Sequence, residues 1–145
     1  MKKCSEVMTR DPVCCLPTDP ATKAARLMMS EDIGSIPVIE NEKSRSLVGI
    51  VTDRDLALKI LAQGRDPKTT KVQDVMTREV VTCHQEDDLQ VALDEMAEYQ
   101  LRRIPVVDDD YRVIGIIAQA DVATRVDQPQ KTAEVVKEIS LSNTH

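Results

Sequence analysis

The apolar positions of this chain follow a helical spacing in two separate stretches. In the first stretch, apolar residues at i, i+3, i+4, i+7 and i+8 predict one buried helix face, made of Ala21, Ala24, Ala25, Met28 and Met29. This helix is expected to begin at 18–20, where a capping side chain precedes Pro20, and to end near Gly34. The same spacing returns in the second stretch, in Leu89, Ala92, Leu93, Met96 and Ala97.

Runs of β-branched residues stand around the first predicted helix. Residues 35–40 and 47–52 predict a pair of adjacent strands, because only the polar loop 41–45 separates them. Residues 13–16 predict a further short strand before the helix. The first half of the chain therefore begins in the order strand, helix, strand, strand.

A second, shorter helix closes each half. Segment 53–63 returns to helical spacing and stops at Gly64. In the second half, the strands are predicted at 103–108 and 112–118, and the last helix at 120–126. The order βαββα thus occurs twice, which predicts an α+β fold of two tandem units.

The sequence also repeats residue by residue. Val7–Arg10 recurs as Val75–Arg78 at an offset of 68 (75 − 7), and beyond the loop 41–45 the offset becomes 66 (121 − 55), where Asp55 corresponds to Asp121. The other matching pairs are Ile36–Val38 with Ile104–Val106 and Gly49–Ile50 with Gly115–Ile116. We therefore expect the function to lie where the two copies meet.

These boundaries predict four segments along the chain. The first unit is expected at 1–64, a polar linker at 65–71, the second unit at 72–127 and a partly helical tail at 128–145. Because a unit of about 60 residues buries little surface alone, the two units are expected to share a core. The tail is expected to dock or to mediate dimerisation, unless it frays.

Composition narrows the classes of function. The chain has 145 residues, of which 41% are hydrophobic and 30% charged, with two Tyr and neither Phe nor Trp, so the core must be aliphatic. Stacking of bases on aromatic rings is therefore nearly excluded, and a net charge of −6 argues against nucleic-acid partners. We expect a cytoplasmic protein, since no apolar run is long enough for a membrane span and no secretory signal is seen.

The chemistry-bearing motif is Thr52–Asp55, which joins a strand to a helix. A Thr followed three residues later by an acid is close to a capping box, so both side chains have a purely structural explanation. The same geometry also suits a ligand, because helix N-termini attract phosphate and a carboxylate accepts hydrogen bonds from ribose hydroxyls. Gly49 would let a neighbouring backbone or a ligand approach the strand closely.

The motifs taken together resemble the CBS domain pair, or Bateman module. The resemblance covers about 7–126 and rests on Val-Met-Thr at 7–9 and 75–77, Ile-Pro-Val at 36–38 and 104–106, and the glycine-to-aspartate motif at 49–55. It implies two units packed sheet to sheet with pseudo-twofold symmetry, and binding of AMP, ADP, ATP or S-adenosylmethionine in clefts between them. It also implies a homodimer and requires no cofactor.

The resemblance assigns roles to the first copy. Asp55 is implied to hold the ribose hydroxyls, Thr52 the ribose or first phosphate, and Arg54 completes the motif. The adenine slot is implied to be lined by Pro12, Val13, Cys14, Ile36 and Pro37, with Val81 and Pro105 at corresponding positions of the second copy.

The second copy departs from this pattern. It keeps Asp121, but Ala118 replaces the Thr52 hydroxyl and Ala120 replaces Arg54. Loss of a charge-assisted contact costs about 1.5–3 kcal/mol, or roughly ten- to a hundredfold in affinity, so we expect the Asp55 site to be the tighter one. Arg103 is implied to reach a phosphate, whereas its neighbour Arg102 is expected to be a solvated strand end.

Other classes of function have little support. His84 is the only histidine before the terminal one, and it is expected at the surface; the acidic run at 108–110 is expected to be a solvated turn. We find no catalytic motif or metal-ligand spacing, and expect no enzyme. The leading hypothesis is a ligand-sensing regulatory module acting on an effector protein. The alternatives are a dimerisation scaffold with empty clefts, in which Thr52 and Asp55 only cap, and redox control through cysteines.

Overall fold

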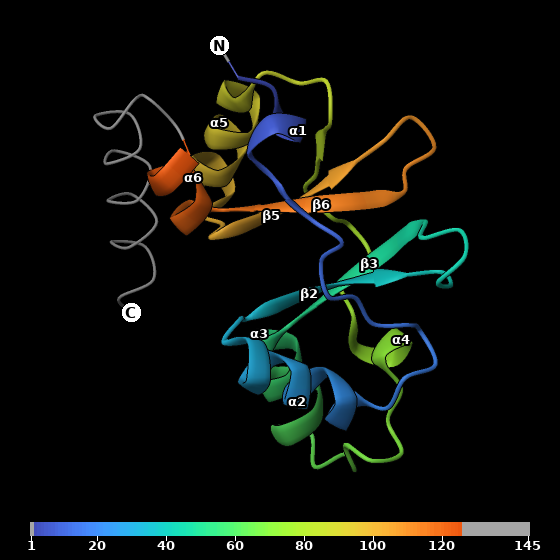
Figure 1. The fold of residues 1–145 in the computed structure, drawn as a ribbon. Coiled ribbons are helices and arrows are strands. Elements are labelled where there is room, and N and C mark those ends of the chain that lie inside the picture. The colour runs from blue at the N-terminus through green and yellow to red at the C-terminus, as the bar shows by residue number, and fades with distance from the viewer. Residues whose placement is uncertain (1, 126–145) are drawn as a thin grey trace. The chain divides into compact units, whose positions relative to one another are not determined.

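The computed structural model describes residues 2–125, with side chains through residue 123. The chain divides into two compact units, and each is treated separately (Figure 1). The first, here the 13–80 unit, holds most of the first sequence repeat. The second, the 81–125 unit, also contains residues 2–12. The predicted tail at 128–145 lies outside the described residues.

The 13–80 unit is built on an antiparallel strand pair. Strand β2 (Ser35–Ile39) pairs with β3 (Leu47–Thr52), with a register shift at Val38/Ile39, as the alternation predicted. The predicted strand at 13–16 is wrong as an extended element. Only Cys15 forms a bridge, to Val38, because its amide and carbonyl bond to Pro37 and Ile39 while its neighbours make no ladder.

The main helix of this unit is α2 (Ala21–Glu31), which ends in left-handed Asp32. Its predicted side-chain cap is wrong: Pro20 occupies the cap position, and the Asp19 carboxylate instead accepts the Leu16 amide at 2.8 Å. The proline still presets the backbone angle needed at a helix start.

The predicted helix 53–63 is observed, but it changes from α-helix to π-helix along its length. It begins as α3 (Asp53–Leu56) and continues as the π-helix η1 (Ala57–Leu61). Gly64 then adopts φ +65°, which supports its predicted role in stopping the helix. A further short helix, α4 (Val72–Val75), was not predicted.

The 81–125 unit contains a four-stranded sheet in the order β1-β6-β5-β4. Strands β5 (Arg103–Val107) and β6 (Val113–Ala118) are antiparallel, as predicted. Strand β4 (Cys83–His84) lies parallel to β5 at one edge. Strand β1 (Thr9–Arg10) lies antiparallel to β6 at the other edge.

Three helices complete this unit. Helix α5 (Leu89–Tyr99) is the predicted amphipathic helix, and it ends in left-handed Gln100. Helix α6 (Gln119–Arg125) follows β6 directly, and the unpredicted α1 (Cys4–Val7) lies against both α5 and α6. Across the described residues, no helix is long and apolar enough to cross a membrane.

Each unit has its own aliphatic core, as the composition required. In the 13–80 unit, Ile36, Val38 and Val51 are fully buried beneath α2. In the 81–125 unit, Leu93 and Ile104 belong to the corresponding cluster. The apolar helix faces predicted from spacing supply residues to both cores.

The spatial units do not coincide with the sequence ranges 1–64 and 72–127. Residues 2–12 belong to the first of these ranges but pack with the second repeat, because the backbone of β1 pairs with β6. Residues 65–80 complete the first repeat in the same way, since Thr77 pairs with Ile50 of β3. Each unit therefore contains the Val-Met-Thr motif with which the other sequence repeat begins: residues 7–9 lie in the 81–125 unit and residues 75–77 in the 13–80 unit.

Candidate functional site

Thr52 and Asp55 form a complete capping box at the start of α3. The Asp55 amide donates to Thr52 Oγ1 at 3.0 Å, and the Thr52 amide donates to Asp55 Oδ2 at 3.0 Å. Two amide donors that the helix itself leaves unpaired are satisfied in this way. The structural explanation of the motif is therefore confirmed, and a ligand role must be judged from what else the carboxylate contacts.

The Asp55 carboxylate is a buried anion with further partners. The residue is only 6% exposed. The Thr77 hydroxyl lies 3.1 Å from Oδ1 and 3.3 Å from Oδ2, and the Lys59 ammonium lies 2.9 Å from Oδ1. A buried charge is tolerated when it is paired and hydrogen-bonded, and here both conditions hold. The site thus places one carboxylate, two hydroxyls and one ammonium together.

Sequence reasoning missed both Thr77 and Lys59. Lys59 follows Asp55 by four residues, a spacing that brings side chains together on a helix. The ion pair between them could therefore have been predicted from the sequence. Thr77 belongs to a repeated motif whose chemistry had no assigned role. Its contact with Asp55 depends on chain pairing between segments 22 residues apart, which no local pattern reveals.

Gly49 explains how the Thr77 segment comes so close. Ile50 and Thr77 exchange backbone hydrogen bonds of 2.8 and 2.7 Å. A Cβ on Gly49 would stand 2.7 Å from Met76 Sδ and 3.0 Å from the Thr77 carbonyl oxygen. The predicted close approach of a backbone at this glycine is therefore confirmed, and the absent side chain is what permits it.

In the second copy, Asp121 is held by a threonine hydroxyl and a backbone amide, as Asp55 is, but its helix start contributes no side-chain hydroxyl. The Thr9 hydroxyl donates to Asp121 Oδ2 at 3.2 Å, and the Ala118 amide donates to the same oxygen at 3.3 Å. Gly115 stands against Met8, as Gly49 stands against Met76. Asp121 is half-buried, and Ala118 offers no hydroxyl in place of Thr52.

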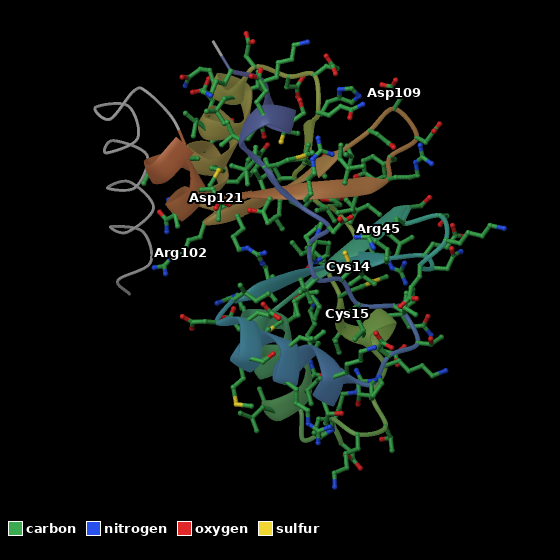
Figure 2. The ribbon with its side chains drawn as sticks, viewed as in Figure 1. Cys14, Cys15, Arg45, Arg102, Asp109 and Asp121 are labelled. Atoms are coloured by element: carbon green, nitrogen blue, oxygen red, sulfur yellow. The ribbon has the colours of Figure 1, made fainter. Side chains whose placement is uncertain are left out.

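The remaining predicted ligand residues are spread over both units. In the 13–80 unit, Arg54 is exposed and Ile36 and Pro37 are buried in β2. Cys14 is half-buried, with the Arg45 guanidinium 3.5 Å from its sulfur (Figure 2). Half-buried Val13 completes the set found in this unit.

The other predicted residues belong to the 81–125 unit. Pro12 and Pro105 are buried there, whereas Val81 and Arg103 are half-buried. Arg103 is the first residue of β5, and Arg102 beside it is exposed, as predicted. The predicted slot 12–14 therefore crosses a unit boundary.

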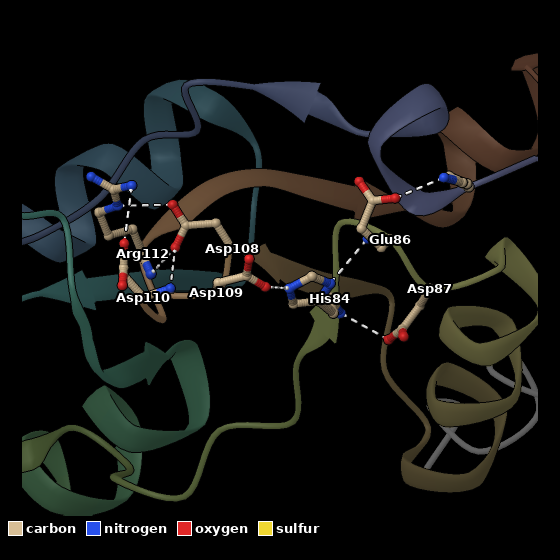
Figure 3. A network of polar contacts seen from close by, with 8 residues as sticks. His84, Glu86, Asp87, Asp108, Asp109, Asp110 and Arg112 are labelled. Carbon is tan, nitrogen blue, oxygen red and sulfur yellow. Dashed lines mark hydrogen bonds and ion pairs between the residues drawn. The ribbon is translucent and has the colours of Figure 1, made fainter.

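His84 and the acidic turn form a surface network on the 81–125 unit (Figure 3). His84 Nε2 lies 2.7 Å from Asp109, and the Glu86 amide donates to Nδ1 at 3.1 Å, so the neutral ring carries its proton on Nε2. His84 is the last residue of β4. Its side chain is 32% exposed.

The turn at 108–110 is confirmed, and it organises around Asp108. Although partial burial opposes ionisation, the amides of Arg112 and Asp110 and the Arg112 guanidinium hold the pKa of Asp108 below its ordinary value of 3.8. The guanidinium Nε lies 2.8 Å from Oδ2. These contacts fix the tight connection between β5 and β6.

Three of the four cysteines are buried. Burial raises the pKa of the Cys15 thiol to about 11. Cys4 and Cys83 share a hydrogen bond, which lowers the pKa of Cys4 and, together with burial, raises the pKa of Cys83. Burial shields these three thiols from reagents whatever their pKa, so among the cysteines half-buried Cys14 is the most open to modification.

A sequence model of the CBS domain matches residues 4–62 and 72–127. An uncharacterised protein of Methanopyrus kandleri is 37% identical over 117 residues, which are 81% of this chain and 59% of that protein. Inosine-5'-monophosphate dehydrogenase of Methanocaldococcus jannaschii is 37% identical over 90% of this chain but 25% of the enzyme. The chain thus spans less than two thirds of either. The CBS domain-containing protein YhcV of Bacillus subtilis is 35% identical over 100% of both chains.

Two solved structures with bound ligands are similar to this chain. One is the CBS domain pair of protein MJ0100 in complex with 5'-methylthioadenosine and S-adenosyl-L-methionine, with a TM-score of 0.71 and 28% identity over 86% of this chain and 94% of that one. The other is CBSX2 in complex with AMP, with a TM-score of 0.71 and 27% identity over 86% of this chain and 95% of that one.

Proposed function

The chain belongs to the CBS domain family, and we propose that it is a non-catalytic regulatory module that binds an adenine nucleotide or adenosyl ligand at Asp55. The observation that carries this proposal is the buried carboxylate, held by Thr52, Thr77 and Lys59 at the start of a helix. The ligands of the similar structures, AMP, S-adenosylmethionine and methylthioadenosine, all contain adenosine with ribose hydroxyls.

The proposed contacts follow from the chemistry of each group. Asp55 accepts hydrogen bonds from the ribose hydroxyls, since an ionised carboxylate offers about four lone-pair positions. Thr52 contributes a hydroxyl at the ribose or first phosphate. The exposed Arg54 contacts phosphate. Main-chain groups at 12–14 and 36–38 face the adenine edge, which requires no aromatic side chain.

Asp121 is proposed as the weaker of two ligand sites. It keeps the carboxylate and the threonine partner, but Ala118 and Ala120 stand where the first copy has Thr52 and Arg54. A ligand with few or no phosphates is favoured there. The loss of one charge-assisted contact corresponds to roughly ten- to a hundredfold in affinity.

The output is proposed to act through an effector protein in the cytoplasm, with the module as a homodimer. A ligand changes the behaviour of a partner only if it binds the competing states of the module with different affinity. The rival function is a dimerisation scaffold with empty sites. It is favoured by the complete set of internal partners that already satisfies Asp55.

Thermal unfolding of the full chain with AMP, ADP, ATP or S-adenosylmethionine tests the proposal. A ligand at about a hundred times its dissociation constant adds roughly 2.7 kcal/mol, which is a readily measured shift. We expect a shift with at least one ligand, reduced in Asp55→Asn and retained in the surface control Asp66→Asn. Unchanged melting with every ligand would favour the scaffold.

A further inference from the structure

Lys59 pairs with the Asp55 carboxylate and is the more exposed residue of this ion pair. Its ammonium lies 2.9 Å from Asp55 Oδ1 and donates to the Val75 carbonyl oxygen at 3.0 Å. The Asp55 side chain is 8% exposed, whereas that of Lys59 is 41% exposed. The buried carboxylate is therefore paired with a partly solvent-exposed ammonium.

Most acceptor positions of Asp55 are already in use. Oδ1 accepts from Thr77 and Lys59, and Oδ2 accepts from the Thr52 amide and, at 3.3 Å, from Thr77 again. A carboxylate has about four such positions, and the single Thr77 proton is shared by both oxygens, so three donors leave about one position. Two ribose hydroxyls can therefore both bind only when an internal donor leaves.

Of the three internal donors, Lys59 is the one that can leave. The Thr52 amide is fixed by the helix start, and Thr77 is fixed by paired backbone hydrogen bonds to Ile50. Lys59 holds its ammonium on a flexible four-carbon stem that is partly exposed. The Lys59 backbone lies within η1, so the ammonium can leave Asp55 by a change in the side chain only.

We propose that Lys59 determines ligand specificity at the Asp55 site, an inference that rests on the proposed function. In the empty site, Lys59 takes the place of the ribose hydroxyls on Asp55. A neutral nucleoside displaces it and leaves its ammonium without an anion. A 5'-nucleotide brings a phosphate on the same sugar, which gives the displaced ammonium a new partner. The site therefore prefers nucleotides over nucleosides.

The sequence repeat offers a parallel at the second site. Arg125 follows Asp121 by four residues, as Lys59 follows Asp55. A basic residue at this spacing is therefore present in both copies, whereas Thr52 and Arg54 are present only in the first. The effect of Lys59 on ligand specificity can therefore be tested separately from the effects of Thr52 and Arg54.

Calorimetric titration of AMP and adenosine into the full chain tests this role. The variants are Lys59→Met and Lys59→Gln; the glutamine retains a donor for the Val75 carbonyl if the methionine variant folds poorly. Lys68→Met is the control, because Lys68 is exposed and lies in the same unit. We expect adenosine to bind about tenfold or more tightly to the Lys59 variants, and the affinity ratio of AMP to adenosine to fall by at least that factor.

The outcomes separate this inference from the proposed function. An unchanged ratio in folded Lys59 variants, with AMP bound by the unaltered chain, overturns the role of Lys59 and leaves the proposed function intact. Adenosine binding that appears only in the Lys59 variants supports both. If neither the unaltered chain nor a folded variant binds either compound, both fail.

Discussion

The hydroxyl of Thr77 donates to the buried carboxylate of Asp55 at 3.1 Å. The repeat supplies the same pair in the other unit, where Thr9 donates to Asp121 at 3.2 Å. In both cases the threonine comes from the segment before one sequence repeat and the aspartate from the end of the other. The threonine of the Val-Met-Thr motif is thus a partner of the site carboxylate, and removing it should affect both folding and ligand binding.

Thr77→Val is expected to destabilise the 13–80 unit by about 1.5–3 kcal/mol, because a hydrogen bond to a buried charge is lost while the shape of the side chain is kept. Urea unfolding measures this as a lower midpoint. Thr69→Val is the control, since exposed Thr69 donates only a long bond of 3.4 Å to a carbonyl. Equal midpoints for the two variants would show that the Thr77 bond adds little.

Gly49→Ala is expected to destabilise the 13–80 unit by about 1–3 kcal/mol through overpacking. The new methyl group would meet Met76 Sδ at 2.7 Å and the Thr77 carbonyl at 3.0 Å. Unfolding of Gly49→Ala, Met76→Ala and the double variant forms a thermodynamic cycle. Because the side-chain clash disappears in the double variant, its loss should be smaller than the sum of the two single losses, whereas strict additivity would contradict direct packing.

Native thiol labelling is expected to modify Cys14 before the other three cysteines. Cys4, Cys15 and Cys83 are buried, and the Cys15 pKa of about 11 keeps that thiol protonated at pH 8. Iodoacetamide labelling followed by peptide mass spectrometry measures the order. Cys14→Ser should leave almost no labelling until denaturant is added. Rapid native labelling of Cys15 or Cys83 would contradict the burial described here.

The raised pKa of Cys15 also predicts a pH dependence of stability. The folded state favours the protonated thiol, so its contribution is complete below the ordinary value of 9.0 and is lost as the pH rises toward about 11. Unfolding of Cys15→Ala should therefore depend less on pH across this window than unfolding of the unaltered chain. If the unfolding free energies of Cys15→Ala and of the unaltered chain changed with pH in the same way, the contribution of Cys15 to the pH dependence would be excluded.

Asp108→Asn is expected to cost about 1 kcal/mol of stability at neutral pH. The pKa of Asp108 lies below 3.8 when folded, so its charged form stabilises the fold above that value and the contribution is lost as the pH falls through the folded pKa. The difference between variant and unaltered chain should therefore shrink as the pH falls below 3.8. Asp109→Asn serves as a neighbouring control, and a constant difference at all pH values would contradict the assignment.

Local order was largely predictable from the sequence. Helical spacing located α2 and α5, and β-branched runs located the strand pairs, because both signals depend on neighbours along the chain. The capping box of Thr52 and Asp55 was predictable for the same reason. The prediction of a cap at 18–20 failed because Asp19 bonds to the amide of Leu16, a local competitor that the pattern does not distinguish.

The sequence by itself determined the two βαββα repeats, the aliphatic cores and the carboxylates at Asp55 and Asp121. Only the tertiary structure decided which segments complete each unit, because backbone pairing of β1 with β6, and of Thr77 with Ile50, joins residues far apart in the chain. The same pairing brings Thr77 to Asp55. Backbone hydrogen bonds are alike for all residue types, so a sequence pattern cannot specify which distant segments will form them.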